Sequence, residues 1–464
     1  MPSRDETEPK TPRTGLAVPQ GRTRRFLHLG RAVGEMAASA AAGSLQQLAR
    51  GQLPALQQLM LSPANARRLA GRLSTLRGAA MKLGQLMSMD GQGVLPPEFA
   101  ELLASLRDQA HHMPATQLTE VLEREYGAGW HQRFRRLSFA PVAAASIGQV
   151  HRAETHEGQV LALKIQYPGV RESIDSDVAN IGLLLRTPGL VPGHLDLAPL
   201  LARVREQLLL ETDYAREAAH AAEYRARLGS DPVLWVPAVV PEHCTPHILA
   251  TEFASGRPVA DWVGPTRPQA ERDHIALALC RLSVREFFDM RLVQTDPNIG
   301  NYLFDADTRR IALLDFGATE AVPVSRVEDL RELGLALKND DHPRLEAAAL
   351  RAGFIDASDP PEQTRAVIEL MRLSGEPLRH VGPYDFGRST LVGTVFEQGR
   401  AQVMGGSGFA RTPPPDLVFL QRKFAGSFLL CSKLQARVDV AAVFGAHLHE
   451  PGAGAPAPQA LAAG

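Results

Sequence analysis

Residues 295–301 read Thr-Asp-Pro-Asn-Ile-Gly-Asn, and residues 310–317 read Arg-Ile-Ala-Leu-Leu-Asp-Phe-Gly. Asn301 is the fifth residue after Asp296, in the pattern Asp-x4-Asn. Asp315 ends a short apolar run that predicts a β-strand. Phosphoryl transfer uses this combination, because one carboxylate orients or deprotonates the acceptor while an Asn and a second Asp hold Mg²⁺ over the phosphates. The two segments therefore predict a magnesium–nucleotide site, with Asp296 as the acid–base carboxylate and Asn301 and Asp315 as metal ligands.

A lone lysine lies upstream in residues 161–165, which read Leu-Ala-Leu-Lys-Ile and predict a β-strand. Lys164 is a candidate for contact with the phosphates if a glutamate on a helix holds it in place. Glu211, Asp213 and Glu217 are the available acids. On one helix Asp213 and Glu217 would share a face and repel each other unless a cation joined them. A solvated acidic face explains the same spacing, so both interpretations stay open at this point.

The composition narrows the class of protein. The chain has 464 residues, of which 44% are hydrophobic and 22% charged. These ordinary values exclude a wholly disordered chain, a collagen-like chain and a multi-span transporter. Its 50 basic and 51 acidic side chains nearly balance, which argues against a nucleic-acid partner. The three cysteines (Cys244, Cys280 and Cys431) are far apart in the sequence, and they predict neither a disulfide framework nor a CxxC metal site.

Arginine is the default basic residue, because only six of the 50 basic residues are lysines. A compact ammonium suits a phosphate or carboxylate contact in a tight pocket where the planar guanidinium does not fit. Each lysine is therefore a candidate for a specific contact, with a solvated surface charge as the alternative. The six are Lys10, Lys82, Lys164, Lys338, Lys423 and Lys433.

Secondary-structure signals change near residue 134. Strands are predicted at 142–152, 159–166, 233–240, 247–253, 302–304 and 311–315. A leucine-rich stretch at 195–228 is predicted to be helical, as is most of the chain after residue 256. Strands with one long helix, followed by a helical half, predict a two-lobed α+β fold.

The predicted organisation has five segments. No apolar run with a small-residue cleavage site follows the basic N-terminal residues, so no secretory signal is expected and the protein is expected to be cytoplasmic. The Ala-rich stretch 26–48 is suited to rest on the inner face of a membrane, or to pack against the protein itself. The segments are a disordered basic arm (1–25), a helical extension (26–133), a lobe with most of the strands (134–254), a helical lobe (255–450) and a disordered tail (451–464).

Together these residues resemble the protein-kinase-like superfamily and, more narrowly, the ABC1/UbiB/COQ8 (AarF-like) family of atypical kinases, over about residues 30–440. In place of a glycine-rich phosphate loop, residues 140–150 read Ala-Pro-Val-Ala-Ala-Ala-Ser-Ile-Gly-Gln-Val, which is similar to the alanine-rich loop of the family. Residues 77–85 read Arg-Gly-Ala-Ala-Met-Lys-Leu-Gly-Gln and resemble its KxGQ signature. Residues 211–213, Glu-Thr-Asp, resemble its ExD motif.

The resemblance implies binding of ATP or ADP with Mg²⁺. Alanines forbid part of the backbone conformations that glycine allows near phosphates, so the nucleotide is expected to sit differently under this loop. The implied contacts are the loop residues Ala143, Ala144, Ala145 and the hydroxyl of Ser146; Lys164, paired with Glu217; the backbone of Glu252, Phe253 and Ala254 against adenine; and Asn301 and Asp315 through the metal.

Two further features bear on the substrate. By resemblance, Lys82 and Gln85 of the helical extension face Glu211 and Asp213 and gate the cleft. The His-Arg-Asp position of kinases is occupied by residues 294–296, Gln-Thr-Asp, and helical sequence resumes soon after residue 317 without an Ala-Pro-Glu motif. The platform for peptide substrates is therefore missing, which argues against phosphorylation of other proteins.

The family supports ubiquinone (coenzyme Q) biosynthesis and quinone-lipid homeostasis. The resemblance thus implies ATP hydrolysis or phosphoryl transfer to a small or lipid-like acceptor, with a lipid or quinone precursor as ligand, quinone-biosynthesis proteins as partners and peripheral membrane contact. One alternative is a small-molecule phosphotransferase of the aminoglycoside- or choline-kinase type, which shares Asp-x4-Asn but lacks a helical extension before the strands. A non-catalytic nucleotide-binding scaffold is the other, and the filled catalytic positions argue against it.

Overall fold

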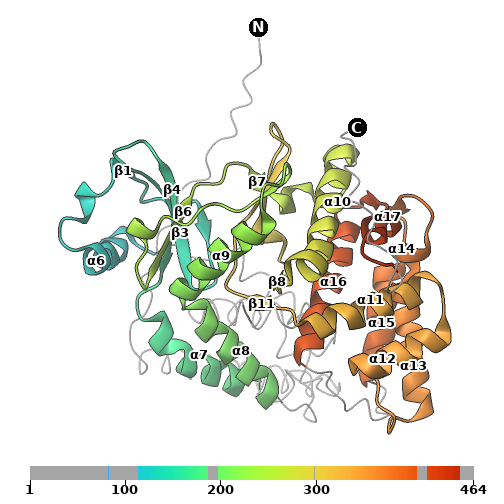
Figure 1. The fold of residues 1–464 in the computed structure, drawn as a ribbon. Coiled ribbons are helices and arrows are strands. Elements are labelled where there is room, and N and C mark those ends of the chain that lie inside the picture. Colours follow the sequence, from blue (N-terminus) through green and yellow to red (C-terminus); the bar gives the residue numbers. More distant parts are fainter. Residues whose placement is uncertain (1–81, 83–112, 186–196, 297, 405–414, 450–464) are drawn as a thin grey trace, which may run out of the picture. The chain divides into compact units, whose positions relative to one another are not determined.

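A computed structural model of the chain describes Lys82 and residues 113–185, 197–296, 298–404 and 415–449 (Figure 1). The predicted basic arm, most of the helical extension including Gln85, and the predicted tail lie outside these residues. The described residues group into two compact units. Unit 1 holds Lys82, 113–215 and 240–253, and unit 2 holds 216–239 and the residues from 254 onward. Residues 216–239, which the sequence-based division places with 134–215, thus group with unit 2.

Unit 1 is built on an antiparallel sheet with the strand order β1-β3-β4-β6, and β2 is paired to β3. A short 3-10 turn, η2 (Trp130–Gln132), precedes the sheet in the chain, and another, η3 (Pro241–His243), precedes β6. The strands are β1 (Arg136–Leu137), β2 (Ala143–Ala144), β3 (Gly148–Glu154), β4 (Val160–Gln166) and β6 (Ile248–Glu252).

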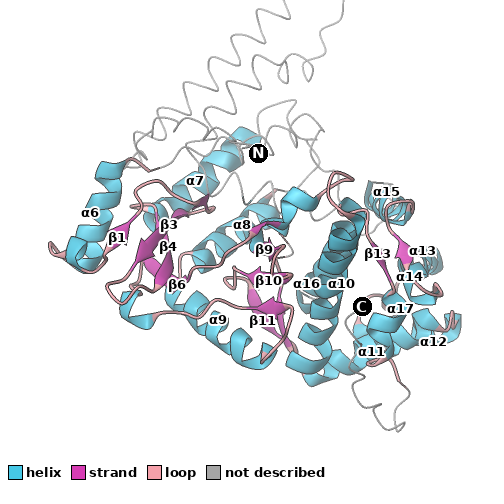
Figure 2. Cartoon of the chain, turned by 90° about the horizontal axis from the view of Figure 1, so that it is seen from above, coloured by secondary structure: helices cyan, strands magenta, loops and turns pink. Residues whose placement is uncertain are grey.

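The alternation along β4 explains which face of this sheet is buried. Leu161, Leu163 and Ile165 are fully buried and pack against apolar residues of helix α6 (Ala115–Tyr126), which lies beside the sheet in Figure 2. Because successive side chains of a strand point to opposite faces, Lys164 faces away from this core. The lone lysine of the predicted strand is thus placed on the second face of the sheet.

Three helices belong wholly or in part to unit 1: α7 (Val170–Leu185), α8 (Ala198–Glu211) and the first residues of α9 (Tyr214–Leu228). The single helix predicted at 195–228 is wrong, since the chain breaks between α8 and α9. At the break, the hydroxyl of Thr212 donates to the carbonyl of Leu209 (2.7 Å), and its carbonyl accepts from Nε2 of Gln166 (2.8 Å). These bonds compete with continuation of the helix. Asp213 therefore precedes α9 and does not share a helical face with Glu217.

Unit 2 combines short strands with most of the helices, so the α+β class is observed as predicted. Its larger sheet has the order β5-β10-β9-β7, and β8–β11 and β12–β13 form two-stranded ladders. The strands are β5 (Leu234–Trp235), β7 (Arg257–Pro258), β8 (Leu292–Gln294), β9 (Tyr302–Asp305), β10 (Arg310–Leu313), β11 (Thr319–Ala321), β12 (Tyr384–Asp385) and β13 (Arg437–Val438). The helices are α10 (Gln269–Arg285), α11 (Val324–Lys338), α12 (His342–Ala352), α13 (Pro361–Ser374), α14 (Glu376–Arg379), α15 (Leu391–Met404), α16 (Pro415–Lys433) and α17 (Val440–Gly445), with short turns η4 (Val259–Trp262), η5 (Glu286–Met290, π-helical) and η6 (Ile299–Asn301).

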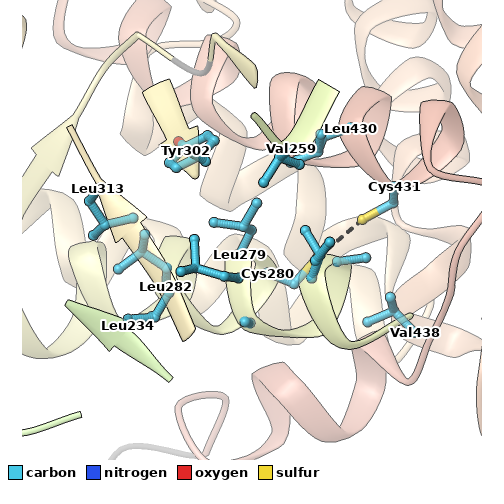
Figure 3. Close-up of a cluster of buried hydrophobic side chains, with 14 of the residues drawn as sticks. Leu234, Val259, Leu279, Cys280, Leu282, Tyr302, Leu313, Leu430, Cys431 and Val438 are labelled. Carbon is cyan, nitrogen blue, oxygen red and sulfur yellow. Dashed lines mark hydrogen bonds between the residues drawn. The ribbon is translucent and has the colours of Figure 1, made fainter. Parts of the chain in front are cut away.

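The main core of unit 2 lies where α10 contacts α16 and the sheet (Figure 3). Leu279 and Leu282 of α10 are buried in this cluster with Leu430 of α16. The thiols of Cys280 and Cys431, far apart in the sequence, meet here with 3.4 Å between their sulfur atoms. Among the residues that the structure describes, no helix has the length and the apolar run needed to cross a membrane.

Gly148 permits a close approach of β3 to β4. An ideal Cβ at this residue would lie 2.3 Å from the carbonyl oxygen of Ile165, closer than any real contact. We expect Gly148→Ala to lower the free energy of unfolding by about 2 kcal/mol or more, because the backbone of β4 has to shift. Chemical denaturation measures this. Gly129→Ala is the control, since nothing lies within 4 Å of its ideal Cβ; equal losses in both variants would contradict the explanation.

Candidate active site

The alanine-rich segment forms the tip of a hairpin in unit 1. Ala143 and Ala144 pair with β3, and the N–H of Ala145 donates to the carbonyl of Gly148 (2.9 Å). Ala143 and Ala144 are exposed. Ser146 follows at the turn. The predicted loop is thus a short, hydrogen-bonded turn that presents small side chains to solvent.

Ser146, Glu211 and Lys82 form a connected polar cluster in unit 1. The hydroxyl of Ser146 donates to Oε2 of Glu211, and Nζ of Lys82 lies 2.6 Å from Oε1 of the same carboxylate. Lys82 is 5% exposed, so the ion pair is largely shielded from water. The structure therefore brings together one residue each of the alanine loop, the ExD motif and the KxGQ motif. Asp213 lies two residues after Glu211, directly before α9.

Lys164 lies on β4, paired in register with Val150 and Leu249. Its Nζ is 5.3 Å from the centroid of the Tyr214 ring, within the range of a cation–π contact. This contact orients the ammonium on the face of the sheet opposite to the core. Lys164 belongs to unit 1 and Glu217 to unit 2, and the pairing that the resemblance implies stays a prediction.

The predicted adenine contacts lie at the end of β6, which is the last strand in the order of its sheet. The N–H of Phe253 donates to the carbonyl of Val160 (3.0 Å), so this group is engaged inside the sheet. The contacts of Glu252, Phe253 and Ala254 with adenine stay predictions, and the N–H of Phe253 has its partner within the sheet.

In unit 2 two hydrogen bonds bring the three predicted chemistry-bearing residues close together. Nδ2 of Asn301 donates to the carbonyl of Asp296 (3.4 Å). The carbonyl of Asn301 in turn accepts from the N–H of Leu314 (3.0 Å), directly before Asp315. This contact exists because β9 and β10 form a hairpin that returns the chain to Asn301. The structure thus places Asp296, Asn301 and Asp315 in one small region.

The donor set at this region fits Mg²⁺. Donation through Nδ2 leaves the amide oxygen of Asn301 as the atom that would contact a metal, and Asp315 supplies a carboxylate. Within the described part of the chain, no group of three or more His, Cys, Asp or Glu side chains is placed to hold a metal. Mg²⁺ bound with a nucleotide usually needs only one or two protein side chains, because phosphate oxygens and water complete its octahedron.

Helix α9 contacts the Asp-Phe-Gly segment along one face. Nη1 of Arg216 donates to the carbonyl of Gly317 (3.1 Å), and Nδ1 of His220 lies 3.2 Å from the carbonyl oxygen of Phe316. One turn later the ring of Tyr224 packs on that of Phe316, with 4.9 Å between centroids. Spacings of four residues place these three side chains on the same helical face.

Glu217 lies on this helix and is 2% exposed. An ideal Cβ at Gly317 would be 3.4 Å from Oδ1 of Asp315 and 3.9 Å from Oε2 of Glu217. Both carboxylates thus lie near the position that a side chain at Gly317 would occupy, at ordinary van der Waals distances from its Cβ.

A buried network that the sequence did not indicate lies behind these residues. Gln294, immediately before Thr295, donates through Nε2 to the carbonyl of Asp315. Its backbone contacts Glu286 and Lys423. The sequence feature that could have indicated this network is Lys423, one of the six lysines. It lies next to Phe424 in a largely apolar helix.

The charge states in this network follow from burial and pairing. Burial raises the pKa of Glu286, against the opposing effect of Lys423. Burial is the largest single effect on Lys423 and would lower its pKa, but the charge of Glu286, the electrostatic effect of Tyr302, the hydrogen bond with Glu286 and a smaller contribution from Asp296 together raise the pKa. Lys423 therefore keeps its positive charge at neutral pH. Burial also raises the pKa of Tyr224, so its hydroxyl stays a donor.

One sheet has a strand that carries a lysine and a turn that is formed by small residues. A hairpin elsewhere is flanked by an Asn and an Asp. Together these features define a protein-kinase-like fold. The family model of the ABC1 atypical kinase-like domain matches residues 105–349. The chain is 34% identical to the mitochondrial atypical kinase COQ8 of Saccharomyces cerevisiae, over 95% of this chain and 87% of that protein. It is 36% identical to the mitochondrial atypical kinase COQ8B of Rattus norvegicus, over 91% of this chain and 79% of that protein. The chain therefore belongs to the ABC1 atypical kinase-like family.

A solved structure is also similar. Rv3197 from Mycobacterium tuberculosis, described in complex with erythromycin, has a TM-score of 0.58 and 27% identity, covering 83% of this chain and 97% of that one. The comparisons confirm the predicted family and the kinase-like α+β fold class. They also confirm the predicted assignment to the COQ8 atypical kinases, the group for which the resemblance implies a role in ubiquinone biosynthesis.

We expect Lys82→Met to lower the melting temperature of the protein. The substitution leaves the largely shielded carboxylate of Glu211 without its cation. Loss of the partner of a buried polar group costs about 1–3 kcal/mol, and differential scanning fluorimetry measures the resulting shift. Arg135→Met is the matched control, because its pair with Glu154 (3.3 Å) leaves the arginine 64% exposed and exposed pairs contribute little. A Lys82→Met variant that melts at the wild-type temperature would show that the pair has no stabilising role.

Proposed function

We propose that this protein binds MgATP and catalyses Mg²⁺-dependent ATP hydrolysis or phosphoryl transfer to a small or lipid-like acceptor, in support of ubiquinone biosynthesis. The observation that carries the proposal is the connected set Asp296, Asn301 and Asp315, at the end of the β9–β10 hairpin. An acid–base carboxylate next to an amide oxygen and a second carboxylate is the minimum that phosphoryl transfer from a metal–nucleotide needs.

The roles of the side chains follow from their chemistry. Asn301 and Asp315 would hold Mg²⁺, which when bound neutralises charge on the phosphates. Asp296 would accept the proton of the attacking hydroxyl or water, and Lys164, with Glu217 as its partner, would contact a phosphate. Lys82 and Gln85 would control access through Glu211 and Asp213.

The remaining parts of the proposal concern ligands and location. We also propose peripheral contact with the inner face of a membrane and partners among quinone-biosynthesis proteins, and membership of the ABC1 atypical kinase-like family supports this proposal. The erythromycin complex of the related Rv3197 supports a binding capacity for a largely apolar ligand besides nucleotide. A quinone precursor is the apolar ligand that we propose, and anionic liposomes with phenolic precursor mimics are the additives with which to measure ATP hydrolysis.

Two other functions remain as alternatives. Transfer to a soluble alcohol, such as an aminoglycoside or choline, would indicate a small-molecule phosphotransferase. A slow ATPase that neither lipid nor detergent stimulates would favour a nucleotide-binding scaffold.

We expect Asp315→Asn to abolish the thermal stabilisation by MgATP. For the wild type, ligand at about a hundredfold its dissociation constant adds ~2.7 kcal/mol of stability, which corresponds to a shift of several degrees. EDTA should remove the same shift. Asp341→Asn is the control, because Asp341 caps α12 and asparagine caps a helix equally well. An undiminished MgATP shift in Asp315→Asn would refute the metal assignment.

We also expect Ala144→Gly to change the preference between ATP and ADP. Glycine widens the backbone conformations open to the loop, and a difference of ~0.5–1 kcal/mol in backbone freedom corresponds to about a twofold to fivefold change in relative affinity. Calorimetric titration with each nucleotide gives the ratio. Ala128→Gly, at an exposed residue after α6, controls for a general effect of glycine; unchanged affinities for both nucleotides in Ala144→Gly would remove the loop from nucleotide selection.

A further inference from the structure

One edge of strand β8 is buried without a neighbouring strand in the described part of unit 2. On its other edge β8 pairs with β11, and the N–H of Thr295 and the carbonyl of Arg291 bond to Ala318 and Val322. Because bonding directions alternate, the N–H and C=O of Gln294 point away from β11. Gln294 is 1% exposed, so both groups need partners inside the protein.

An ion pair supplies both partners. Oε1 of Glu286 accepts from the N–H of Gln294 (3.0 Å), and Nζ of Lys423 donates to its carbonyl (3.2 Å). Nζ of Lys423 also lies 2.6 Å from Oε2 of Glu286, and the two side chains are 2% and 0% exposed. The pair thus binds the edge of β8 as a neighbouring strand would, with one donor and one acceptor.

Elements from three sides hold the pair in place. Glu286 begins the π-helical turn η5 at the end of α10, and Lys423 lies on α16. The hydroxyl of Tyr224, on α9, donates to the same Oε1 of Glu286 (2.8 Å). The carboxylate therefore receives three polar contacts, and its orientation is fixed.

Gln294 transmits this constraint to the proposed site. Its Nε2 donates to the carbonyl of Asp315, and its Oε1 accepts from the hydroxyl of Tyr302 (3.4 Å). Asp296 follows two residues later in the same segment. Gln294 is therefore bonded through its side chain to Asp315, the proposed metal ligand, and its backbone continues into the segment that carries Asp296.

We propose that Lys423 is a positioning residue for the reaction: with Glu286 it fixes the backbone of Gln294 and so sets the placement of Asp296 relative to Asp315. The inference rests on the proposed function of Asp296, Asn301 and Asp315. Lys423 itself contacts neither nucleotide nor metal in this role.

Stability alone is a poor explanation for this pair. Two charges are costly to bury, and apolar residues of similar volume often give equal or higher stability. Apolar residues cannot, however, accept from one backbone group and donate to the other. A small displacement of a catalytic group lowers turnover strongly, so a fixed Gln294 has a direct value for catalysis.

The test compares Lys423→Met, Lys423→Met with Glu286→Gln, and Ser427→Ala by ATP turnover well below each melting temperature. We expect Lys423→Met to reduce kcat about tenfold or more, while KM for MgATP changes little. The double variant should recover part of the melting temperature, because no lone carboxylate stays buried, but kcat should remain low since the carbonyl of Gln294 still lacks its donor. Ser427→Ala removes the buried contact between Ser427 of α16 and Ser283 of α10 (2.8 Å). This variant should keep the wild-type kcat.

Several outcomes would overturn the inference. Wild-type kcat in folded Lys423→Met would do so, as would recovery of kcat together with stability in the double variant. Should neither variant fold, hydrogen exchange of the wild-type protein decides, because the amide of Gln294 is expected to exchange as slowly as the interior of α10, and rapid exchange would contradict the proposal. A wild-type protein that neither binds nor hydrolyses MgATP would refute the proposed function instead, and the exchange measurement would still test the contact.

Discussion

A carboxylate stays buried in a protein only where a cation and hydrogen-bond donors surround it, and Glu286 meets this condition through Lys423, Tyr224 and the backbone of Gln294. The arrangement of unit 2 around its proposed site depends on this carboxylate. It connects α9, α10 and α16 to the short strand β8, and it does so at the residue that also holds the carbonyl of Asp315. Short strands such as β8 have few backbone bonds of their own, so side chains from helices have to complete them.

Local sequence was sufficient to predict that the residues nominated for chemistry lie close together. Asp296 and Asn301 precede one hairpin and Asp315 follows it, so spacing along the chain almost determines their proximity in space. The strand of Lys164 was equally predictable, because alternation of apolar residues marks its buried face. The break in the helix predicted at 195–228 was only partly accessible from local sequence. The bond from the Thr212 hydroxyl to Leu209 is local, whereas the bond from Gln166 comes from a strand of unit 1 and no property of the leucine-rich stretch records it.

The supporting network was beyond reach of the sequence, since Lys423 and Gln294 are 129 residues apart. Composition nevertheless gave a hint. In a chain that uses arginine almost everywhere, Lys82 and Lys423 are both buried, and each contacts a carboxylate at 2.6 Å. An ammonium is compact and has three donors on a single atom, so Nζ of Lys423 contacts both the carboxylate of Glu286 and the carbonyl of Gln294. Rare residue types in a biased composition therefore point to sites with strict steric demands.

The hydrogen bond between Ser146 and Glu211 has a consequence for affinity measurements. A phosphate oxygen that uses the Ser146 hydroxyl competes with a carboxylate of the same polypeptide, which is always present at a high effective concentration. The apparent dissociation constant then exceeds the intrinsic one by the reciprocal of the fraction of molecules in which this bond is open. Weak nucleotide binding in a titration would in that case report an internal competitor and not a poorly formed pocket.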